Sequence, residues 1–351
     1  MSAAWRARSR DRQRHHAARG DYKEIRRRAH PKTRACRKGM KQMRSAVGID
    51  LGGTNIKWGI VAEDGEVLLE GLVPTESERG PDELLNKLSA IAEQAVQSST
   101  DLNIALDSVG IGTAGQVQRA SGIVMGATAT LPGWAGMPLG ERIGRETGLP
   151  VVVDNDVNMI AIGEAWIGAG QEWEDFLCVA LGTGVGGCWV SDRRVYGGRE
   201  GYAGEFGHMI VSMGGRECSC GNRGCWESYA SVTGLKKLAY EEWTGGPWEE
   251  PETLFQYARE GNIRALSIVT QYCEYVAAGL TGLIHIYNPS AIVLGGAIVA
   301  GQGTFLLERI QTLLNRQVMP VYQQPEPVAV VAAQLGRHAG VVGAALAALK
   351  R

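Results

Sequence analysis

The chain has 351 residues, of which 44% are hydrophobic and 21% charged, an ordinary composition for a globular protein long enough for two domains. Its longest apolar region, residues 276–301, is interrupted by His285, Asn288 and Pro289, which excludes a membrane span there. The seven cysteines form no framework of spread pairs and the N-terminus lacks the apolar core of a signal peptide, so we expect a cytoplasmic protein in a reducing environment.

Residues 1–44 differ from the rest of the chain. They hold 16 of the 36 Lys and Arg residues, 3 of the 37 Asp and Glu residues, and almost no aliphatic side chains. Such a segment cannot bury a core, so we expect a basic, disordered extension. A nucleic-acid-binding arm is one interpretation. We favour the simpler one, an upstream extension with Met40 or Met43 as the natural start, because a helix-turn-helix needs an apolar core.

From residue 45 onward the pattern is a strand meander followed by alternating helices and strands. The first two strands are joined by the glycine turn Gly52-Gly53-Thr54. In chain order we expect strands at 46–51, 56–62 and 67–73, a helix at 81–98, a strand at 108–112, a helix at 139–147, a strand at 150–154 and a helix from Asp156 to about 168.

The unit of strand, glycine turn and strand then occurs a second time. Gly182-Thr183-Gly184 separates apolar strands at 176–181 and 185–190, which suggests two related domains that each offer backbone N–H groups to phosphate. Strands alternating with helices predict an α/β architecture. The remaining elements expected are helices at 233–243, 251–260 and 263–288, a strand at 291–294, a helix at 304–317, a strand at 328–332 and a helix at 337–349.

The glycine run 182–187 also fits G-x-G-x-x-G, the dinucleotide-binding fingerprint. That motif requires a helix after the glycines, whereas the residues that follow here are typical of a strand. The interpretation of this chain as a nicotinamide oxidoreductase is therefore supported by the glycine run alone. No G-x-x-x-x-G-K-[ST] sequence is present, so the chain is not a P-loop enzyme.

Asp50 precedes the first glycine turn. The glycines let the backbone approach an anion, Thr54 can donate its hydroxyl, and Asp50 can hold Mg²⁺ through water because magnesium prefers oxygen ligands. The alternative is a hairpin turn beside a solvent-exposed aspartate. On its own this motif leaves both interpretations open.

The run Asp154-Asn155-Asp156-Val157-Asn158 lies where a strand ends and a helix begins. Asp156 could simply be the N-cap of that helix. Alternatively, one acid faces a cleft as the general base for a sugar hydroxyl while Asn155 hydrogen-bonds another hydroxyl. In combination with the two glycine turns and the segment described next, we favour catalysis.

Segment 201–227 contains a candidate zinc site, which we call the zinc loop. Free, hydrophobic thiols are the alternative, but the neighbouring glycines permit the tight turns that a metal site needs. Glu205 and Glu227 flank the cluster, and we expect the metal to fold the loop so that these acids face a polyhydroxylated substrate. Imidazole and thiolates together suit a closed, tetrahedral structural zinc site, and the four candidate ligands are His208, Cys218, Cys220 and Cys225.

Together these segments resemble the ROK family (repressors, uncharacterised reading frames and sugar kinases). The resemblance covers about residues 46–351, and its most specific part is G-E-x-G-H followed by C-x-C-G-x-x-G-C-x-E. It implies a two-lobed actin/hexokinase-type ATPase fold with a structural zinc loop. We expect residues 45–155 plus 337–351 to form one lobe and residues 156–336 the other.

The resemblance also implies roles for single residues. Asp156 matches the family's catalytic base, which takes the proton of the sugar's 6-hydroxyl as it attacks the γ-phosphate of ATP. The expected sugar contacts are Asn155, Glu205, His208 and Glu227, with Gly115 and Thr130 beside them. The expected nucleotide and Mg²⁺ contacts are Asp50, Gly52, Gly53, Thr54, Lys57, Gly182, Thr183 and Gly184, with Gly295 and Gly296 on the adenosine side.

We therefore expect an ATP-dependent hexose kinase with Mg²⁺ and structural Zn²⁺, and glucose as the first substrate. Many glucokinases of the family have asparagine where Thr130 stands, so a kinase for N-acetylmannosamine or N-acetylglucosamine is the alternative. A non-catalytic, sugar-sensing ROK regulator would lack the base or the glycine turns and would carry a winged-helix domain, for which residues 1–44 are too short and polar. By analogy with the family we expect a homodimer or homotetramer and no nucleic-acid partner.

Overall fold

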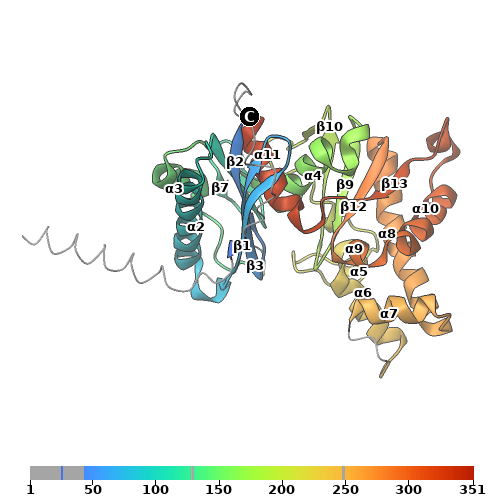
Figure 1. The fold of residues 1–351 in the computed structure, drawn as a ribbon. Helices are drawn as coiled ribbons and strands as arrows, with labels where there is room; N and C mark the ends of the chain where they lie inside the picture. The colour runs from blue at the N-terminus through green and yellow to red at the C-terminus, as the bar shows by residue number, and fades with distance from the viewer. Residues whose placement is uncertain (1–24, 27–42, 127, 129, 247–249) are drawn as a thin grey trace, which may run out of the picture.

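The protein is described by a computed structural model that covers residues 25–26, 43–126, 128, 130–246 and 250–351. Two α/β lobes stand side by side, with the earlier strands in blue on the left of Figure 1 and most of the later elements on the right. The expected α/β class with two lobes is confirmed. Within the described part of the chain, no helix is long and apolar enough to cross a membrane.

The first lobe is built on a six-stranded sheet with the order β1-β4-β3-β2-β5-β8. Strands β2, β3 and β4 form the expected antiparallel meander, and β5 and β8 run parallel to β2. The strands are β1 (Ile25–Arg26), β2 (Ser45–Leu51), β3 (Asn55–Ala62), β4 (Val67–Pro74), β5 (Ser108–Thr113) and β8 (Val151–Asn155); the helices packed on them are α2 (Pro81–Asp101), α3 (Leu139–Thr147) and α11 (Ala339–Leu349).

Alternation along β2 decides what each face of this sheet carries. Val47 and Ile49 pack into the core formed with α2 and α3, whereas Ala46 packs with α11 on the opposite face. Because side chains alternate with a period of two, Asp50 shares the α11 face. A Cβ added at Gly340 of α11 would lie 2.5 Å from the Asp50 Cγ, so the helix leaves room for this carboxylate by carrying no side chain there.

Helix α11 packs between the first sheet and helix α4 (Asp156–Ile167), and small residues make the close approach possible. A Cβ added at Gly110 of β5 would lie 1.8 Å from the carbonyl oxygen of Ala344, and one added at Gly343 would lie 1.7 Å from that of Met159. Real Cβ atoms do not come this close to a backbone oxygen. The central layer of the molecule therefore depends on glycine at these positions (Figure 1).

Replacing Gly343 with alanine should lower the free energy of unfolding by about 1–3 kcal/mol, because the added methyl group forces α11 away from α4. Replacing Gly282 with alanine is the matched control, since Gly282 lies within helix α8 (Ile263–Tyr287) and an added Cβ meets nothing within 4 Å. That control should gain about 0.5–1 kcal/mol from helix propensity. Urea denaturation checks both, and equal midpoints for the two variants would contradict the packing argument.

The second lobe is built on a five-stranded sheet with the order β11-β10-β9-β12-β13. Strands β12 and β13 run parallel to β9, and β10 returns antiparallel from the second glycine turn as expected. The strands are β9 (Phe176–Leu181), β10 (Val185–Ser191), β11 (Arg194–Val195), β12 (Ala291–Gly295) and β13 (Ala329–Ala332); the further helices are α5 (Glu227–Ala230), α6 (Val232–Glu242), α7 (Pro251–Arg259), α9 (Ala297–Gln302) and α10 (Thr304–Gln317).

The two faces of this second sheet are covered by α8 and α4. Leu177 and Val179 of β9 lie in the core that includes α8, and Cys178 lies in the smaller core that includes Ala161 of α4. Helix α4 begins directly after the last strand of the first sheet and covers a face of the second. It therefore links the two lobes through the segment that carries the candidate base.

The sequence pattern missed the shortest elements. These include the hairpin of β6 (Val117–Gln118) and β7 (Ile123–Val124), the strand β11 and the helices α5 and α9. Elements of two to six residues are stabilised by tertiary contacts and leave little periodicity to read. Most of the expected disordered extension lies outside the described residues; of its residues, Ile25–Arg26 pair antiparallel with β4 as an added edge strand.

Candidate functional site

The turn from β8 into α4 positions the candidate base. Asn155 caps the helix, because its Oδ1 accepts from the backbone N–H groups of Val157 (2.9 Å) and Asn158 (3.3 Å). The N-cap considered for Asp156 is therefore wrong: Asn155 takes that position, and Asp156 is the first residue of the helix. The Asn155 Nδ2 donates to the carbonyl oxygen of Gly115 at 3.2 Å, which leaves its second N–H available.

The carboxylate of Asp156 is half-buried and hydrogen-bonded to one backbone N–H, that of Val157, at 2.9 Å. Burial, assisted by the negative charge of Asp50, raises the pKa of Asp156 to about 6, although backbone N–H groups and Asn155 act in the opposite direction. The two acids meet because β2 and β8 both run parallel to β5, so their carboxyl ends lie at one edge of the sheet. An acid with this pKa can accept a proton near neutral pH.

Asp50 is nearly buried and forms an ion pair with the expected neighbour Lys57, whose Nζ lies 3.1 Å from the Asp50 Oδ2. The turn that follows is closed by the Gly52 N–H, which donates to the carbonyl oxygen of Asn55 at 3.1 Å. A Cβ added at Gly53 would lie 2.7 Å from the Cβ of Thr130. The first glycine turn therefore lies directly against the loop that contains Thr130, one of the residues expected to bind the sugar.

Two residues of these loops are exposed to solvent, Thr54 in the first turn and Thr130 beside it. The carbonyl oxygen of Thr54 accepts from the Thr75 N–H at 2.9 Å, and the hydroxyl groups of Thr128 and Thr130 are 2.9 Å apart. Both side-chain hydroxyl groups therefore lie where a ligand could reach them.

The second glycine turn, at 182–184, lies beside a third, Gly295-Gly296. The Gly182 N–H donates to the Gly184 carbonyl oxygen at 3.0 Å, and Thr183 at the tip is exposed. Gly296, which follows Gly295 at the end of β12, has a φ of 95°, and an added Cβ would lie 2.3 Å from the carbonyl oxygen of Leu181. These turns meet because β9 and β12 are adjacent parallel strands.

The zinc loop brings its four candidate ligands together. Their ligand atoms lie within 4.8 Å of one another, and the cysteines form no disulfide. The Cys218 Sγ is 3.6 Å from the His208 Nδ1, and the Cys220 Sγ is 3.6 Å from the Cys225 Sγ. Sulfur and nitrogen ligands around a tetrahedral zinc ion are roughly 3.5–3.8 Å apart from one another. The distances between these ligand atoms therefore fit zinc.

Tight turns hold the cluster. The Gly221 N–H donates to the Cys218 carbonyl oxygen at 3.0 Å, and the Cys218 N–H donates to that of Asn222 at 2.9 Å. Gly224 has a φ of 81°, and an added Cβ would lie 1.7 Å from the carbonyl oxygen of Ser212. The glycines of this loop are therefore required by its geometry, as the sequence indicated.

The expected sugar-contacting acids lie on either side of this cluster. His208 faces Cys218 with its Nδ1, while its Nε2 lies 3.8 Å from the Glu205 Oε2. The Glu227 Oε2 accepts from the Val185 N–H at 3.0 Å, which ties the zinc loop to the second glycine turn. Its Oε1 lies 3.4 Å from the Ser219 Oγ.

Two residues of the site's surroundings, Gln116 and Arg119, were not identified from the sequence. Gln116 donates from its Nε2 to the Glu205 Oε1, and Arg119 forms an ion pair with the buried Asp154. The Gln116–Glu205 pair is 89 residues apart, and single-sequence spacing carries no signal for such a contact. Only the position of Gln116 directly after the expected contact Gly115 could have pointed to it.

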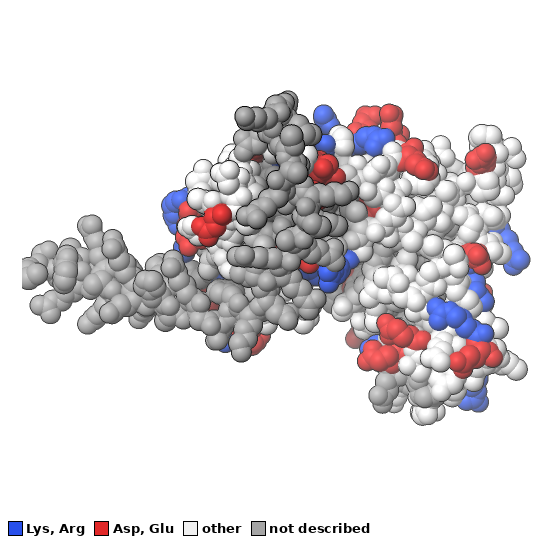
Figure 2. All heavy atoms as spheres, in the orientation of Figure 1, with Lys and Arg blue, Asp and Glu red and all other residues white. Residues whose placement is uncertain are grey.

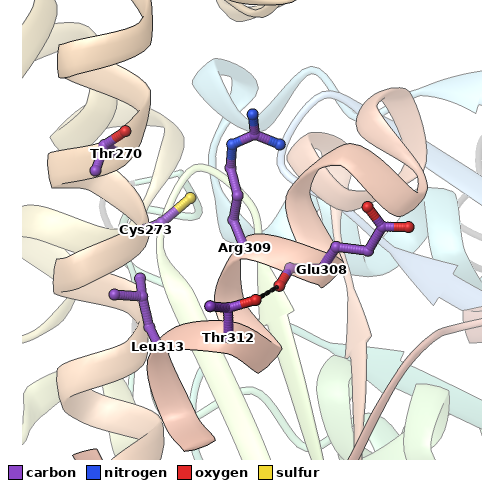
Figure 3. Close-up of a pocket in the computed structure, with 6 residues that line it drawn as sticks. All are labelled: Thr270, Cys273, Glu308, Arg309, Thr312 and Leu313. Atoms are coloured by element: carbon purple, nitrogen blue, oxygen red, sulfur yellow. Dashed lines mark hydrogen bonds between the residues drawn. The ribbon is translucent and has the colours of Figure 1, made fainter. Parts of the chain in front are cut away.

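A hollow of about 330 Å³ between α8 and α10 lies apart from this site. In Figure 3 it is lined by side chains of both helices, and none of them belongs to the expected site. Its arginine, Arg309, lies with its guanidinium 3.6 Å from the centre of the Phe305 ring and donates to the carbonyl oxygen of that residue. The lining residues are Thr270, Cys273, Glu308, Arg309, Thr312 and Leu313.

Charged side chains of both signs are mixed over the second lobe. On the face drawn in Figure 2, the Lys and Arg residues around α7 and α10 stand among Asp and Glu residues. Exposed pairs such as Lys236 with Glu250, whose Nζ and Oε2 are 3.5 Å apart, are part of this mixture.

Two curated relatives are informative about this chain. The glucokinase of Thermotoga maritima is 33% identical over 311 residues, which cover 85% of this chain and 95% of the relative. The xylose repressor of Caldicellulosiruptor bescii is 29% identical over 288 residues, which cover 79% of this chain and 71% of the relative. Kinase and repressor names thus occur among its relatives, with the higher identity to the kinase.

Solved structures show the same fold. A ROK hexokinase from Thermus thermophilus superposes with a TM-score of 0.75 at 31% identity, covering 87% of this chain and 98% of the other. A ROK family glucokinase from Streptomyces griseus, solved with glucose and AMPPNP, gives a TM-score of 0.73 at 33% identity, covering 88% and 100%. The model of the ROK family matches residues 46–351. With this match and these relatives, the chain belongs to the ROK family.

Proposed function

We propose that this chain is an ATP-dependent hexose kinase that phosphorylates the 6-hydroxyl group of its sugar, with glucose as the leading substrate. The observation that carries the proposal is the half-buried carboxylate of Asp156, whose pKa is raised to about 6 at the carboxyl edge of the first sheet. The glucokinase relative and the relative solved with glucose and AMPPNP support a hexose and ATP as the two substrates.

In this mechanism Asp156 accepts the proton of the 6-hydroxyl group while the hydroxyl oxygen bonds to the γ-phosphorus. The bond between the γ-phosphorus and the bridging oxygen breaks, and its electron pair leaves with ADP. Phosphoryl transfer needs positioning and charge stabilisation more than covalent catalysis. The backbone of the glycine turns at 52–53 and 182–184 would hold the phosphates, and Gly295 with Gly296 would border the adenosine.

Magnesium and zinc have separate places in the proposal. The carboxylate of Asp50 offers oxygen atoms of the kind magnesium prefers, and the ion, when bound, would neutralise charge on the phosphate oxygens. The thiolates and the His208 Nδ1 would hold zinc, which fits a structural role because all four positions are filled by protein ligands. His208 would then present its Nε2, together with Glu205, to the sugar.

Sugar contacts would come from both lobes. Asn155 retains one free N–H, and Glu205, Glu227 and Thr130 offer hydroxyl-binding oxygen atoms. Thr130 stands where an asparagine is frequent in the family's glucokinases, and threonine is the smaller side chain. This difference favours an N-acetylhexosamine as the second candidate substrate, because a bulkier 2-substituent needs room.

The test is ADP release, measured by enzymatic coupling, with ATP, Mg²⁺ and glucose, mannose, fructose, N-acetylglucosamine or N-acetylmannosamine. We expect the highest kcat/KM for glucose. A higher value for either N-acetylated sugar would move the assignment to the second candidate. No turnover of any of these sugars by folded, zinc-loaded protein would overturn the proposal and leave a sugar-sensing regulator.

The acid limb of the pH profile is a further expected result. Only ionised Asp156 can accept the proton, so kcat/KM should fall about tenfold per pH unit below its pKa of about 6. Replacing Asp50 with asparagine removes a negative charge that raises this pKa, so the limb should move to lower pH even though overall activity falls. A limb that moves to higher pH in this variant would contradict the assignment.

A further inference from the structure

Arg119 of the first lobe contacts the turn that carries the candidate base. It directly follows β6, at the tip of the β6–β7 hairpin. Its Nε lies 2.7 Å from the Asp154 Oδ2, and its Nη1 donates to the carbonyl oxygen of Val195, in β11 of the second lobe, at 3.2 Å. One guanidinium group therefore connects the base-carrying turn with a strand of the other lobe.

Asp154 is the buried partner in this arrangement, with 5% of its surface exposed. Its Oδ1 accepts from the Asn155 N–H at 2.8 Å and from the Asn158 Nδ2 at 2.9 Å. Burial raises the pKa of Asp154, and the positive charge of Arg119 is the strongest influence in the opposite direction. Arg119 thus helps to keep ionised the carboxylate that fixes the backbone directly before Asp156.

Glycines shape the path of the Arg119 side chain through the second lobe. A Cβ added at Gly197 would lie 2.5 Å from the Arg119 Nη1, and one added at Gly201 would lie 3.2 Å from its Cγ. Gly201 has a φ of 100°, and its added Cβ would also lie 2.9 Å from the carbonyl oxygen of Val117. The segment after β11 therefore closes around this arginine.

The same segment leads to Glu205, and the β6 region contacts it twice. Gln116 donates to Glu205 at one end, and Arg119 donates to Val195 at the other. We call residues 195–205 the bridging segment. Its position relative to the turn at Asp154–Asp156 is set by Gln116, Val117 and Arg119 of the first lobe, which all lie against it.

We propose that Arg119 is a positioning residue for phosphoryl transfer, which holds the turn carrying Asp156 in register with the bridging segment that carries Glu205. This inference rests on the proposed kinase function. The planar fork of arginine can engage Asp154 and Val195 at fixed geometry, whereas lysine has one nitrogen on a flexible stem. Misplacing a catalytic group by about 1 Å can cost roughly 100-fold in rate.

The test compares Arg119→Ala and Arg119→Lys with a matched control, Arg193→Ala. Arg193 donates to two backbone carbonyl oxygens, those of Ala165 (3.1 Å) and Gln171 (2.8 Å), and neither residue belongs to the expected site. We expect kcat to fall about 10–100-fold in Arg119→Ala, with KM for ATP within about twofold. Arg119→Lys should give an intermediate kcat, and Arg193→Ala should keep the wild-type value.

A double mutant tests whether Arg119 acts through Asp154. If it does, Arg119→Ala combined with Asp154→Asn should lose no more kcat than the worse single variant, because the second change removes an interaction already lost. If the loss of kcat in the double mutant equals the product of the two single losses, Arg119 does not act through Asp154. Unchanged kcat in Arg119→Ala would overturn the positioning role outright.

Amide hydrogen exchange provides a readout that does not require turnover. In Arg119→Ala, exchange should become faster at residues 154–158 and in the bridging segment, and it should stay unchanged there in Arg193→Ala. Unchanged exchange in Arg119→Ala would overturn the inference even with an active enzyme, and faster exchange with unchanged kcat would reduce Arg119 to a structural link. Absence of sugar phosphorylation by the wild-type protein would instead mark failure of the proposed function.

Discussion

Replacing Asp156 with asparagine should lower kcat by roughly 10²–10⁴-fold while the protein remains folded. Asparagine has nearly the shape of aspartate and can still accept from the Val157 N–H, which lies 2.9 Å from the Asp156 Oδ1. What it loses is the ability to accept the hydroxyl proton. The measurement is single-turnover phosphorylation of the preferred sugar, which separates the chemical step from product release.

The same substitution should leave stability unchanged or raise it. The pKa of Asp156 is raised from 3.8 to about 6 in the folded protein, so stability falls as pH rises through this window, and at neutral pH the ionised carboxylate opposes folding. Asp175→Asn is the control, since this half-buried acid accepts a bond from the Asp192 N–H and lies at the end of β9 opposite the second glycine turn. Wild-type kcat in Asp156→Asn would refute its role as base.

Replacing Cys220 with serine should remove zinc and, with it, most of the sugar affinity. Serine is a poor zinc ligand at neutral pH, and losing one of four ligands should weaken zinc binding by at least about 100-fold. The bound metal shapes the loop that carries His208 and Glu205. Without zinc this loop should become disordered, and the site should lose the side chains that bind the sugar. Metal analysis and calorimetric titration with the preferred sugar measure the two effects.

Cys273→Ala is the control for losing a thiol. Cys273 is buried in α8, outside the cluster, so this variant should lose some stability but keep its zinc and its sugar affinity. A zinc-free Cys220→Ser protein that binds sugar as tightly as the wild type would contradict the prediction that sugar binding depends on zinc. It would leave zinc a purely local role in the loop.

Much of the architecture follows from local sequence. The apolar run at 46–51 predicted a strand, and β2 spans Ser45–Leu51. The ligand spacing of the zinc loop could be recognised because its four residues lie within eighteen positions. The glycine turns were visible for the same reason, since each is a local break between two apolar strands.

The contacts that complete the site are long-range, and the sequence carried no signal for them. Helix α11 lies against β2 although Gly48 and Val341 are almost three hundred positions apart, and no local pattern in the sequence predicts a contact over that separation. The choice of N-cap was undecidable because Asn155 and Asp156 are adjacent and both residue types cap helices well. Arg119 likewise became meaningful only when the fold brought it to Asp154.

The central claim is transfer of the γ-phosphoryl group to the 6-hydroxyl of a hexose, and identifying the product tests it most directly. We would record a ¹H–³¹P correlation spectrum after incubating the zinc-loaded protein with ATP, Mg²⁺ and glucose. We expect a phosphomonoester whose phosphorus couples to the two protons on C6, formed in step with ADP. Phosphate on any other oxygen, or ADP formed without a sugar phosphate, would contradict the central claim.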